Sequence, residues 1–482
     1  MLTLKDPSLL LSDAYIDGAW IAGARRTPVK NPSTGQIVAE VADVGVEGAR
    51  AAIDAAHRAQ GEWAARTARE RSNILLKWNQ LLLDNADDLA RILTAEMGKP
   101  FLEAKGEIAY GASFIEWFAQ EGRRVYGDMI PGHQPDKRIL VLKQPVGVAV
   151  SITPWNFPNA MIARKVGPAL AAGCAFVARP SELTPLSALA MAALGERAGI
   201  PRGVLNIVTS ADASGVGQEF CANPKVRKIS FTGSTRVGTI LMRQSADGIK
   251  KLSLELGGNA PFIVFDDADL DKAVEGAMIA KFRNAGQTCV CANRIYVQRG
   301  VLDAFATKLA AAVAQLKVGD GADSGVQIGP LISPPALAKV EAHVEDAVAK
   351  GAKIVTGGRR HSAGDLFYEP TVLSGATSQM RLSREETFGP VAPLFPFDTV
   401  EEAIQLANDT EFGLASYFYS NDLGRVWKVA EALEYGMVGV NTGLVSTAEA
   451  PFGGVKMSGL GREGSKYGID EYLTVKYMCL SV

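Results

Sequence analysis

The stretch GVAVSITPWNFP, residues 147–158, indicates the fold class of this chain. Its apolar first half predicts a short buried strand, its prolines bound a turn, and a helix-forming segment follows at 159–172. The same order of strand and helix then recurs, with strands expected at 175–180, 203–209 and 228–234. Because successive strand–helix units favour parallel pairing with helices on both faces, we expect a doubly wound α/β sheet.

A second alternating series begins after the diglycine Gly257-Gly258, where we place a domain boundary. Its expected strands are 261–265, 294–298, 353–358, 391–397 and 416–420. Its expected helices are 269–285, 301–316, 335–350, 399–409 and 423–434. Ala-rich helices are expected ahead of both series, at 47–62, 68–97 and 102–121. Outside the two sheets lie the turn-rich stretch 127–136, the alternating run 138–143 and the strand-like end 470–482.

The charge balance and composition exclude several classes of protein. With 50 Lys and Arg against 52 Asp and Glu in 482 residues, the chain has no basic footprint for nucleic acid. The N-terminus lacks the order of a secretory signal, and no apolar run approaches the ~18 residues of a membrane span. Five cysteines show no disulfide spacing, and four scattered histidines form no metal-ligand pair. We therefore expect a cytoplasmic protein without a metal site.

Cys289 is a candidate nucleophile. It lies in GQTCVC, residues 286–291, between an expected helix and an expected strand. Glycine and small polar neighbours could leave the thiol exposed and surrounded by backbone N–H groups, and both conditions favour a nucleophilic thiolate. The alternative is a small buried apolar residue, as most cysteines are.

Two further residues suit base and oxyanion roles. Glu255 ends the alternating segment SLE and adjoins LGG, so an apolar setting could raise its pKa and make it a general base. Asn156 follows a parallel strand at the sheet edge where α/β proteins bind ligands, so its amide could donate to an oxyanion. The alternatives are a surface carboxylate at a strand end and a helix cap.

The segment FTGSTRVG, residues 231–238, predicts an anion site between a strand and a helix. Its small residues would place backbone N–H groups at the helix N-terminus. It is not the GxGxxG dinucleotide fingerprint, so alone it is weak evidence for a nucleotide.

Together these motifs resemble the aldehyde dehydrogenase superfamily over nearly the whole chain, and most closely its NAD(P)-dependent succinate-semialdehyde dehydrogenases. The matching segments are TPWNFP, FTGSTRVG, LELGG, FRNAGQTCVCANR, EETFGP and PFGGVKMSGLGREGSKYG. The resemblance implies an aldehyde dehydrogenase-like α/β fold with two doubly wound parallel-sheet domains and a small β oligomerisation element. Residues 1–122 and 146–257 would form the dinucleotide-binding domain, 258–457 the catalytic domain, and 123–145 and 458–482 the oligomerisation segments.

The resemblance implies covalent catalysis. The Cys289 thiolate would attack the aldehyde carbon, and the Asn156 amide with the Cys289 backbone N–H would hold the oxyanion. Hydride transfer would leave a thioester, which water activated by Glu255 would hydrolyse. The carboxylate at this position favours release of a free acid, because relatives that acylate coenzyme A generally lack it.

The resemblance also implies a nicotinamide coenzyme. Trp155 and Asn156 match positions near the nicotinamide ribose and diphosphate, and the pair Gly233 and Ser234 matches the diphosphate-binding turn. Glu386 matches the carboxylate that holds the nicotinamide ribose. Phe388 matches the residue that packs beside the ring.

Coenzyme choice depends on the segment Arg179-Pro180-Ser181-Glu182, where the family usually has Lys-Pro-Ala/Ser. Arg179 and Ser181 match coenzyme-binding positions. The carboxylate of Glu182 would accept from a 2′-hydroxyl and repel a 2′-phosphate, whereas Arg179 binds phosphate well. The sequence favours NAD, and NADP stays open.

Substrate choice depends on Arg164, Arg283 and Ser446, which match the residues that bind the distal carboxylate in succinate-semialdehyde dehydrogenases. Succinate semialdehyde is therefore the expected substrate. Glutarate semialdehyde or a broad range of aldehydes stays open, since one methylene shifts discrimination by only ~1–3 kcal/mol. Two other classes, a thiol esterase without nicotinamide and a non-catalytic protein on this fold, fit the joint set of motifs less well.

Two further expectations follow from the resemblance. Cys291 would form a redox switch with Cys289, or it is simply a packed small residue. The chain would act on a small-molecule aldehyde as a homodimer or homotetramer, with no nucleic acid and no membrane as partner.

Overall fold

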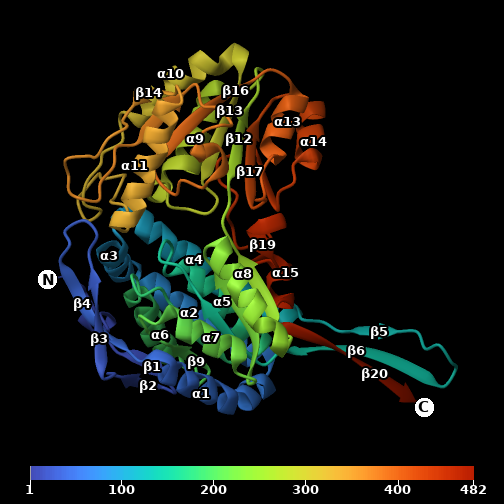
Figure 1. Cartoon of the computed structure of the whole chain (residues 1–482). Helices are drawn as coiled ribbons and strands as arrows, with labels where there is room; N and C mark the ends of the chain where they lie inside the picture. Colours follow the sequence, from blue (N-terminus) through green and yellow to red (C-terminus); the bar gives the residue numbers. More distant parts are fainter. Residues whose placement is uncertain (1) are drawn as a thin grey trace.

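The computed structural model describes residues 2–482, which fold around two large sheets and a smaller projecting one (Figure 1). The first sheet is made of β1 (Ala14–Ile16), β2 (Ala19–Ile21), β7 (Val148–Ile152), β8 (Phe176–Arg179), β9 (Leu205–Ile207), β10 (Val226–Thr232), β11 (Lys251–Glu255) and β19 (Gly459–Leu460). Their spatial order is β19-β11-β10-β7-β8-β9-β1-β2. The central strands β11, β10, β7, β8 and β9 are parallel, which confirms the doubly wound α/β arrangement.

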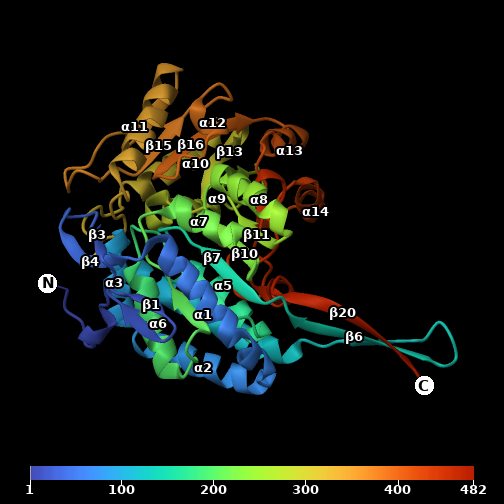
Figure 2. The ribbon, with the colours of Figure 1, turned by 60° about the horizontal axis from the view of Figure 1, so that its bottom comes forward.

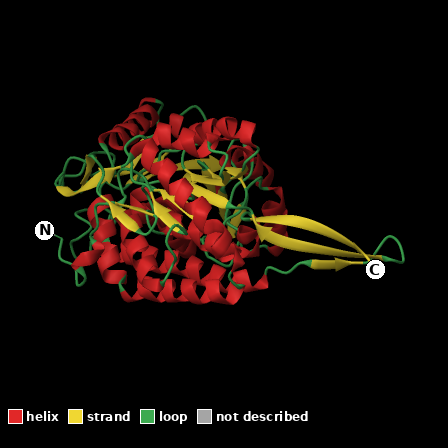
Figure 3. Cartoon of the chain, turned by 90° about the horizontal axis from the view of Figure 1, so that it is seen from below, coloured by secondary structure: helices red, strands yellow, loops and turns green. Residues whose placement is uncertain are grey.

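Helices cover both faces of this sheet, because its strands are apolar on both sides. One face packs against α1 (Gly45–Ala65), α7 (Ala213–Ala222) and α8 (Thr235–Ser245). The other packs against α5 (Ala160–Ala172) and α6 (Leu186–Ala198). A further helical layer contains α2 (Ala68–Asp84), α3 (Ala86–Met97) and α4 (Phe101–Glu121). Figure 3 shows the helices enclosing the strands of the body.

The second sheet begins where the first ends, because β11 stops at Glu255 and β12 starts at Ala260. Its strands are β12 (Ala260–Val264), β13 (Ala292–Gln298), β14 (Lys353–Thr356), β15 (Thr371–Ser374), β16 (Val391–Phe397), β17 (Ala415–Tyr419) and β18 (Met437–Val440). They lie in the order β14-β15-β16-β13-β12-β17-β18, and only the described pair β14–β15 is antiparallel. One face packs against α9 (Leu270–Phe282) and α10 (Leu302–Val313). The other packs against α11 (Pro334–Ala349), α13 (Val400–Asn408) and α14 (Leu423–Ala432).

An arm of β5 (Asp128–Ile130), β6 (Lys137–Pro145) and β20 (Leu473–Ser481) projects from the body (Figures 1 and 2). β20 pairs antiparallel with β6 from Leu473 opposite Pro145 to Ser481 opposite Lys137. Apolar side chains on the arm are strongly exposed, with Met129 at 76% and Val475 at 70%. A separate hairpin of β3 (Arg25–Lys30) and β4 (Ile37–Asp43) lies near the N-terminus.

The structure departs from the sequence-based expectations at several places. The single helix expected at 68–97 is two helices, because Asn85 ends α2 and donates its side chain to the Leu81 carbonyl at 2.8 Å. The stretch 127–136, expected to be rich in turns, also contains β5. The short strands β1 to β4, β15 and β18 were not expected. Residues 459–460, expected in an oligomerisation segment, form β19 and pair with β11 of the first sheet. The limits of the domains stay a prediction.

Neither a membrane span nor a metal cluster is present in the part of the chain that the structure describes. None of its helices is long and apolar enough to cross a bilayer. His, Cys, Asp and Glu side chains there form no group of three that could hold a metal ion.

Candidate active site

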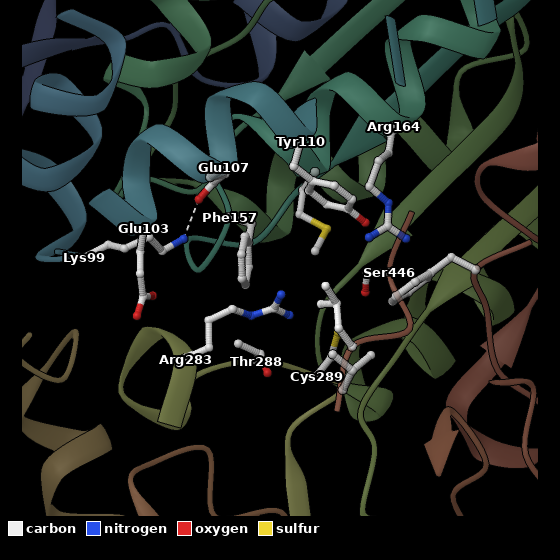
Figure 4. Close-up of a pocket in the computed structure, with 15 residues that line it drawn as sticks. Lys99, Glu103, Glu107, Tyr110, Phe157, Arg164, Arg283, Thr288, Cys289 and Ser446 are labelled. Carbon is white, nitrogen blue, oxygen red and sulfur yellow. Dashed lines mark hydrogen bonds and ion pairs between the residues drawn. The ribbon is translucent and has the colours of Figure 1, made fainter. Parts of the chain in front are cut away.

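Cys289 lies between two cavities at the junction of the sheets. One cavity, of about 300 Å³, is also lined by Arg164, Arg283 and Ser446 (Figure 4). The other, of about 380 Å³, is lined by the 154–156 turn, Gly233, Ser234, Glu386 and Phe388. The structure therefore brings the predicted substrate residues to one side of the cysteine and most predicted coenzyme residues to the other.

The loop before Cys289 has an unusual backbone. Helix α9 ends at Phe282, and Asn284 and Ala285 both adopt the left-handed region at φ 53°. For residues other than glycine this costs about 1–3 kcal/mol each, so other contacts must hold the loop. The Gln287 side chain supplies two of them, donating to the Asn284 carbonyl at 3.2 Å and accepting from the Ile332 N–H at 3.0 Å. The helix expected at 269–285 is thus shorter, and its last residues shape the loop before Cys289.

The Asn156 side chain is oriented toward that loop. It follows β7, is 3% exposed, and its amide donates to the Gln287 carbonyl at 3.0 Å. The amide group carries a second N–H. The residue Asn156 lines the cavity that Cys289 also lines. This arrangement suits a preorganised hydrogen-bond donor to an oxyanion that develops during a reaction.

Glu255 ends β11 in an apolar setting. It is 2% exposed, and neither carboxylate oxygen has a hydrogen-bond partner within residues 2–482. Burial raises the pKa of Glu255 well above its usual range, and the negative charge of Glu463 adds to the effect. A carboxyl group with a raised pKa can take a proton from water near neutral pH, as a general base must.

The Cys289 thiol is less activated than its sequence surroundings suggest. Burial raises the pKa of this thiol to about 12, although the positive charge of Arg164 lowers it. Desolvation therefore outweighs the glycines and small polar neighbours that favour a thiolate. A raised pKa favours the neutral thiol near neutral pH, so a nucleophilic role would require the thiol to lose its proton.

The cavity of about 300 Å³ is lined by two positively charged side chains, Arg164 and Arg283, as well as by the Cys289 thiol. Arg164 is 1% exposed, packs 3.8 Å from the Phe452 ring centre and pairs with Glu463 at 2.7 Å, yet its Nη2 has no partner among the described groups. Arg283 Nε is likewise unpartnered in the described chain. Figure 4 shows both guanidinium groups and the Ser446 hydroxyl reaching toward the space beside Cys289. Unsatisfied buried donors of this kind are costly, and an anionic ligand would satisfy them.

The second cavity has the features of a dinucleotide site. Trp155 and Phe388 meet edge to face at 5.6 Å, a surface for a flat ring. Burial raises the pKa of Glu386 to about 7, and its carboxylate can accept from ribose hydroxyls. Ser234 caps α8, and the Gly233 N–H donates to the Glu255 carbonyl at 3.0 Å. The open first turn of α8 suits a diphosphate, so the chain's residues fit a nicotinamide dinucleotide.

The residues expected to select the coenzyme line neither of the two cavities that Cys289 lines. Arg179 is 4% exposed and donates to the Glu182 carboxylate and the Ser210 carbonyl, both at 2.9 Å. The Ser181 hydroxyl accepts from the Leu183 N–H at 3.2 Å. The ion pair partly neutralises Glu182, so the two residues expected to have opposing influences on coenzyme choice are in direct contact.

The sequence and the fold of the chain are similar to those of known proteins. Residues 20–478 match the aldehyde dehydrogenase family. The chain belongs to the aldehyde dehydrogenase family. It is 60% identical to a glutarate-semialdehyde dehydrogenase of Pseudomonas aeruginosa, with 99% of each chain covered. It is also 60% identical to the succinate-semialdehyde dehydrogenase [NADP(+)] GabD of Escherichia coli, with 100% of each covered. A crystal structure of succinate-semialdehyde dehydrogenase from Burkholderia pseudomallei has a TM-score of 0.99, 61% identity and full coverage of both chains.

Sequence reasoning about this aldehyde dehydrogenase missed several residues of the site. Tyr110 on α4 lines the substrate cavity, and its hydroxyl has no partner inside residues 2–482. Glu463 forms ion pairs with both Arg164 and Lys165. Glu463 stands in the quoted segment GLGREG, which could have marked it, whereas no local pattern distinguishes Tyr110 from a core aromatic residue of its helix.

Cys291 of this aldehyde dehydrogenase is buried at 7% exposure, and its thiol donates to the Lys281 carbonyl at 3.0 Å. Cys289 and Cys291 are both free thiols. The redox switch between them stays a prediction.

Proposed function

We propose that this aldehyde dehydrogenase oxidises succinate semialdehyde to succinate with NAD(P)+. The observation that carries the proposal is the cavity shared by Cys289, Arg164, Arg283 and Ser446. A short aldehyde with a terminal carboxylate would place its carbonyl at the thiol and its charge at the arginines. Arg suits that role because its planar fork meets a carboxylate through two hydrogen bonds.

In the proposed mechanism, the Cys289 thiol gives its proton to water as its sulfur attacks the aldehyde carbon, and a thiohemiacetal forms. The Asn156 amide and the Cys289 backbone N–H hold the oxygen that becomes negative. A bound nicotinamide would supply the hydride acceptor, and loss of hydride from this carbon would leave a thioester on Cys289. Trp155 and Phe388 would orient the ring, and Glu386 would hold its ribose.

Glu255 acts in the second half of the reaction. Its carboxylate takes a proton from water, whose oxygen attacks the thioester carbon. The C–S bond then breaks, succinate is released, and the departing sulfur takes the proton back from Glu255 to regenerate the thiol. Burial supports this role, because it raises the pKa of Glu255 toward the range where a carboxyl group can exchange protons with water.

For the coenzyme, we propose that both NAD and NADP are used and that Glu182 favours NAD. The contact between Glu182 and Arg179 weakens the repulsion of a 2′-phosphate. Relatives whose names specify NADP(+) support acceptance of that coenzyme. In this proposal, Glu182 is the residue that favours NAD, and Arg179 weakens that preference.

Glutarate semialdehyde is the second candidate substrate. Two relatives at 60% identity are named glutarate-semialdehyde dehydrogenases. One added methylene changes binding by only ~1–3 kcal/mol, so a cavity of about 300 Å³ can take both lengths.

For the assembly, we propose a homodimer or homotetramer joined through the arm. The exposed apolar side chains Met129, Val475 and Tyr477 support this, because a monomer would leave them in water. We further propose that residues 1–122 and 146–257 bind the dinucleotide, that 258–457 form the catalytic domain, and that 123–145 and 458–482 join subunits. Sedimentation at micromolar concentration tests the assembly, and a stable monomer would contradict it.

Steady-state kinetics test the proposed substrate. The panel contains succinate semialdehyde, glutarate semialdehyde, butanal and an aromatic aldehyde, each with NAD and with NADP. The proposal expects both semialdehydes to exceed butanal in kcat/KM by at least about tenfold, the value of one charge-assisted hydrogen bond. Equal kcat/KM for butanal would show that the arginines do not select a carboxylate.

A further inference from the structure

Three charged residues at the start of α4 contact both loops of the active site. Lys99 lies just before the helix, and Glu103 and Glu107 face the same way because they are four residues apart. Lys99 and Glu107 form an ion pair whose side chains are 1% and 0% exposed (Figure 4). These residues line the same cavity as Cys289.

Lys99 and Glu107 hold the loop that carries Asn156. The Lys99 ammonium donates to the Asn156 carbonyl at 2.8 Å and lies 3.7 Å from the Phe157 ring centre. One Glu107 oxygen accepts from the backbone N–H groups of Asn159 at 2.9 Å and Ala160 at 3.2 Å. Glu107 thereby caps α5, whose own N-cap side chain makes no capping bond in the described structure.

Glu103 holds the loop that carries Cys289. Its carboxylate accepts from the Asn284 N–H at 2.8 Å, at the first left-handed residue of that loop. The Asn284 side chain in turn donates to the Asn156 carbonyl at 3.1 Å. One carbonyl oxygen, that of Asn156, therefore accepts from both Lys99 and Asn284 and joins the two loops.

We propose that Lys99, Glu103 and Glu107 form a clamp that positions the Asn156 amide against the Cys289 loop. The clamp residues are positioning residues, since they act through Asn156 and Asn284 and take no part in bond making. The inference rests on the roles given to Cys289 and Asn156 in the proposed function. A buried ion pair is a poor way to gain stability, and fixing one arrangement of two loops explains its presence better.

The first test replaces Lys99 by Met, which keeps the length of the side chain and removes its charge. Lys105→Met is the matched control, because Lys105 lies nearby on α4 but is exposed and pairs only with Asp87, at 2.8 Å, among the described residues. A displacement of about 1 Å at a reacting centre lowers rates by about 100-fold. We expect kcat of Lys99→Met to fall by about that factor with KM for aldehyde and coenzyme changed less than about threefold, and Lys105→Met to match wild type.

The second test replaces Glu103, whose carboxylate accepts a hydrogen bond from the Asn284 N–H. Glu103→Ala removes the bond to Asn284 and should lower kcat in the same way. Glu103→Gln keeps an oxygen that accepts from the Asn284 N–H, so it should recover most of the lost kcat. These two Glu103 variants test the clamp if Lys99→Met does not fold. Glu103 is only half-buried, and its replacement leaves the ion pair between Lys99 and Glu107 intact.

Each kinetic assay is run with succinate semialdehyde and with butanal, and next to Cys289→Ala. The clamp is overturned if kcat of Lys99→Met stays within twofold of wild type, if Glu103→Gln is as slow as Glu103→Ala, or if only KM changes. The clamp is also overturned if the decrease in kcat is accompanied by an equal decrease in affinity for the coenzyme. Turnover by Cys289→Ala would instead contradict the proposed function, so the two failures are distinguishable.

Discussion

Arg283→Leu tests the carboxylate site most cleanly. Arg164 also pairs with Glu463, so its removal would disturb the surroundings of Glu255. Arg283 forms no ion pair with any residue that the structure describes, and its Nε is unpartnered there. Leucine keeps an apolar side chain at this position but ends short of the guanidinium carbon, which lies 5.6 Å from the Phe157 ring centre. The substitution therefore removes the charge and the donors and leaves an apolar residue in place.

The expected loss follows from one charge-assisted interaction. Hydrogen bonds to charged groups contribute about 1.5–3 kcal/mol each. At about 1.4 kcal/mol per factor of ten, kcat/KM for succinate semialdehyde should fall by about tenfold to 150-fold. Butanal has no carboxylate, so its kcat/KM should stay the same or rise.

The assay follows reduced nicotinamide by absorbance with both aldehydes and reports the ratio of their kcat/KM values. Arg299→Leu is the control, because Arg299 is exposed and pairs with Asp398 on the surface. An unchanged ratio in Arg283→Leu would refute the reasoning, even if both activities fell.

Three other predictions concern the coenzyme and the two thiols. Glu182→Ser should raise the NADP-to-NAD ratio of kcat/KM by about five- to tenfold by removing the repulsion of a 2′-phosphate, and an unchanged ratio would assign selection to Arg179. Because burial raises the pKa of Cys289 to about 12, its alkylation by iodoacetamide should accelerate about tenfold per pH unit from pH 7 to 9. A plateau below pH 8 would show a thiolate already formed. After mild peroxide, dithiothreitol should restore wild-type activity but not that of Cys291→Ala, and equal recovery would leave Cys291 a packing residue.

Sequence periodicity predicts the long elements well and the short ones poorly. The run 147–153 predicts β7 because it is apolar on both faces of a strand. The structure buries both faces of β7. The strands β1 and β2 have only three residues each, too few for a period to appear, and tertiary pairing defines them. The break at Asn85 was missed because apolar spacing continues across it while a side-chain cap ends the first helix.

The family motifs predict which side chains gather around Cys289, but not their protonation. The surroundings GQTCVC suggest an activated thiol, yet burial by distant segments raises its pKa. The residues Lys99, Glu103 and Glu107 carry no motif of their own, because their role depends on contacts with loops far away in the sequence. Sequence pattern predicts chemistry that is local to a segment, whereas electrostatics and positioning depend on the packed chain.

The central claim is that Cys289 forms a thioester with the substrate and that Glu255 promotes its hydrolysis. The most direct measurement mixes Glu255→Gln with coenzyme and succinate semialdehyde, quenches in acid, and analyses the peptides by mass spectrometry. The account predicts a burst of reduced coenzyme and a succinyl group on the peptide that carries Cys289. A burst with an unmodified Cys289 peptide, or a succinyl group on another residue, would contradict it.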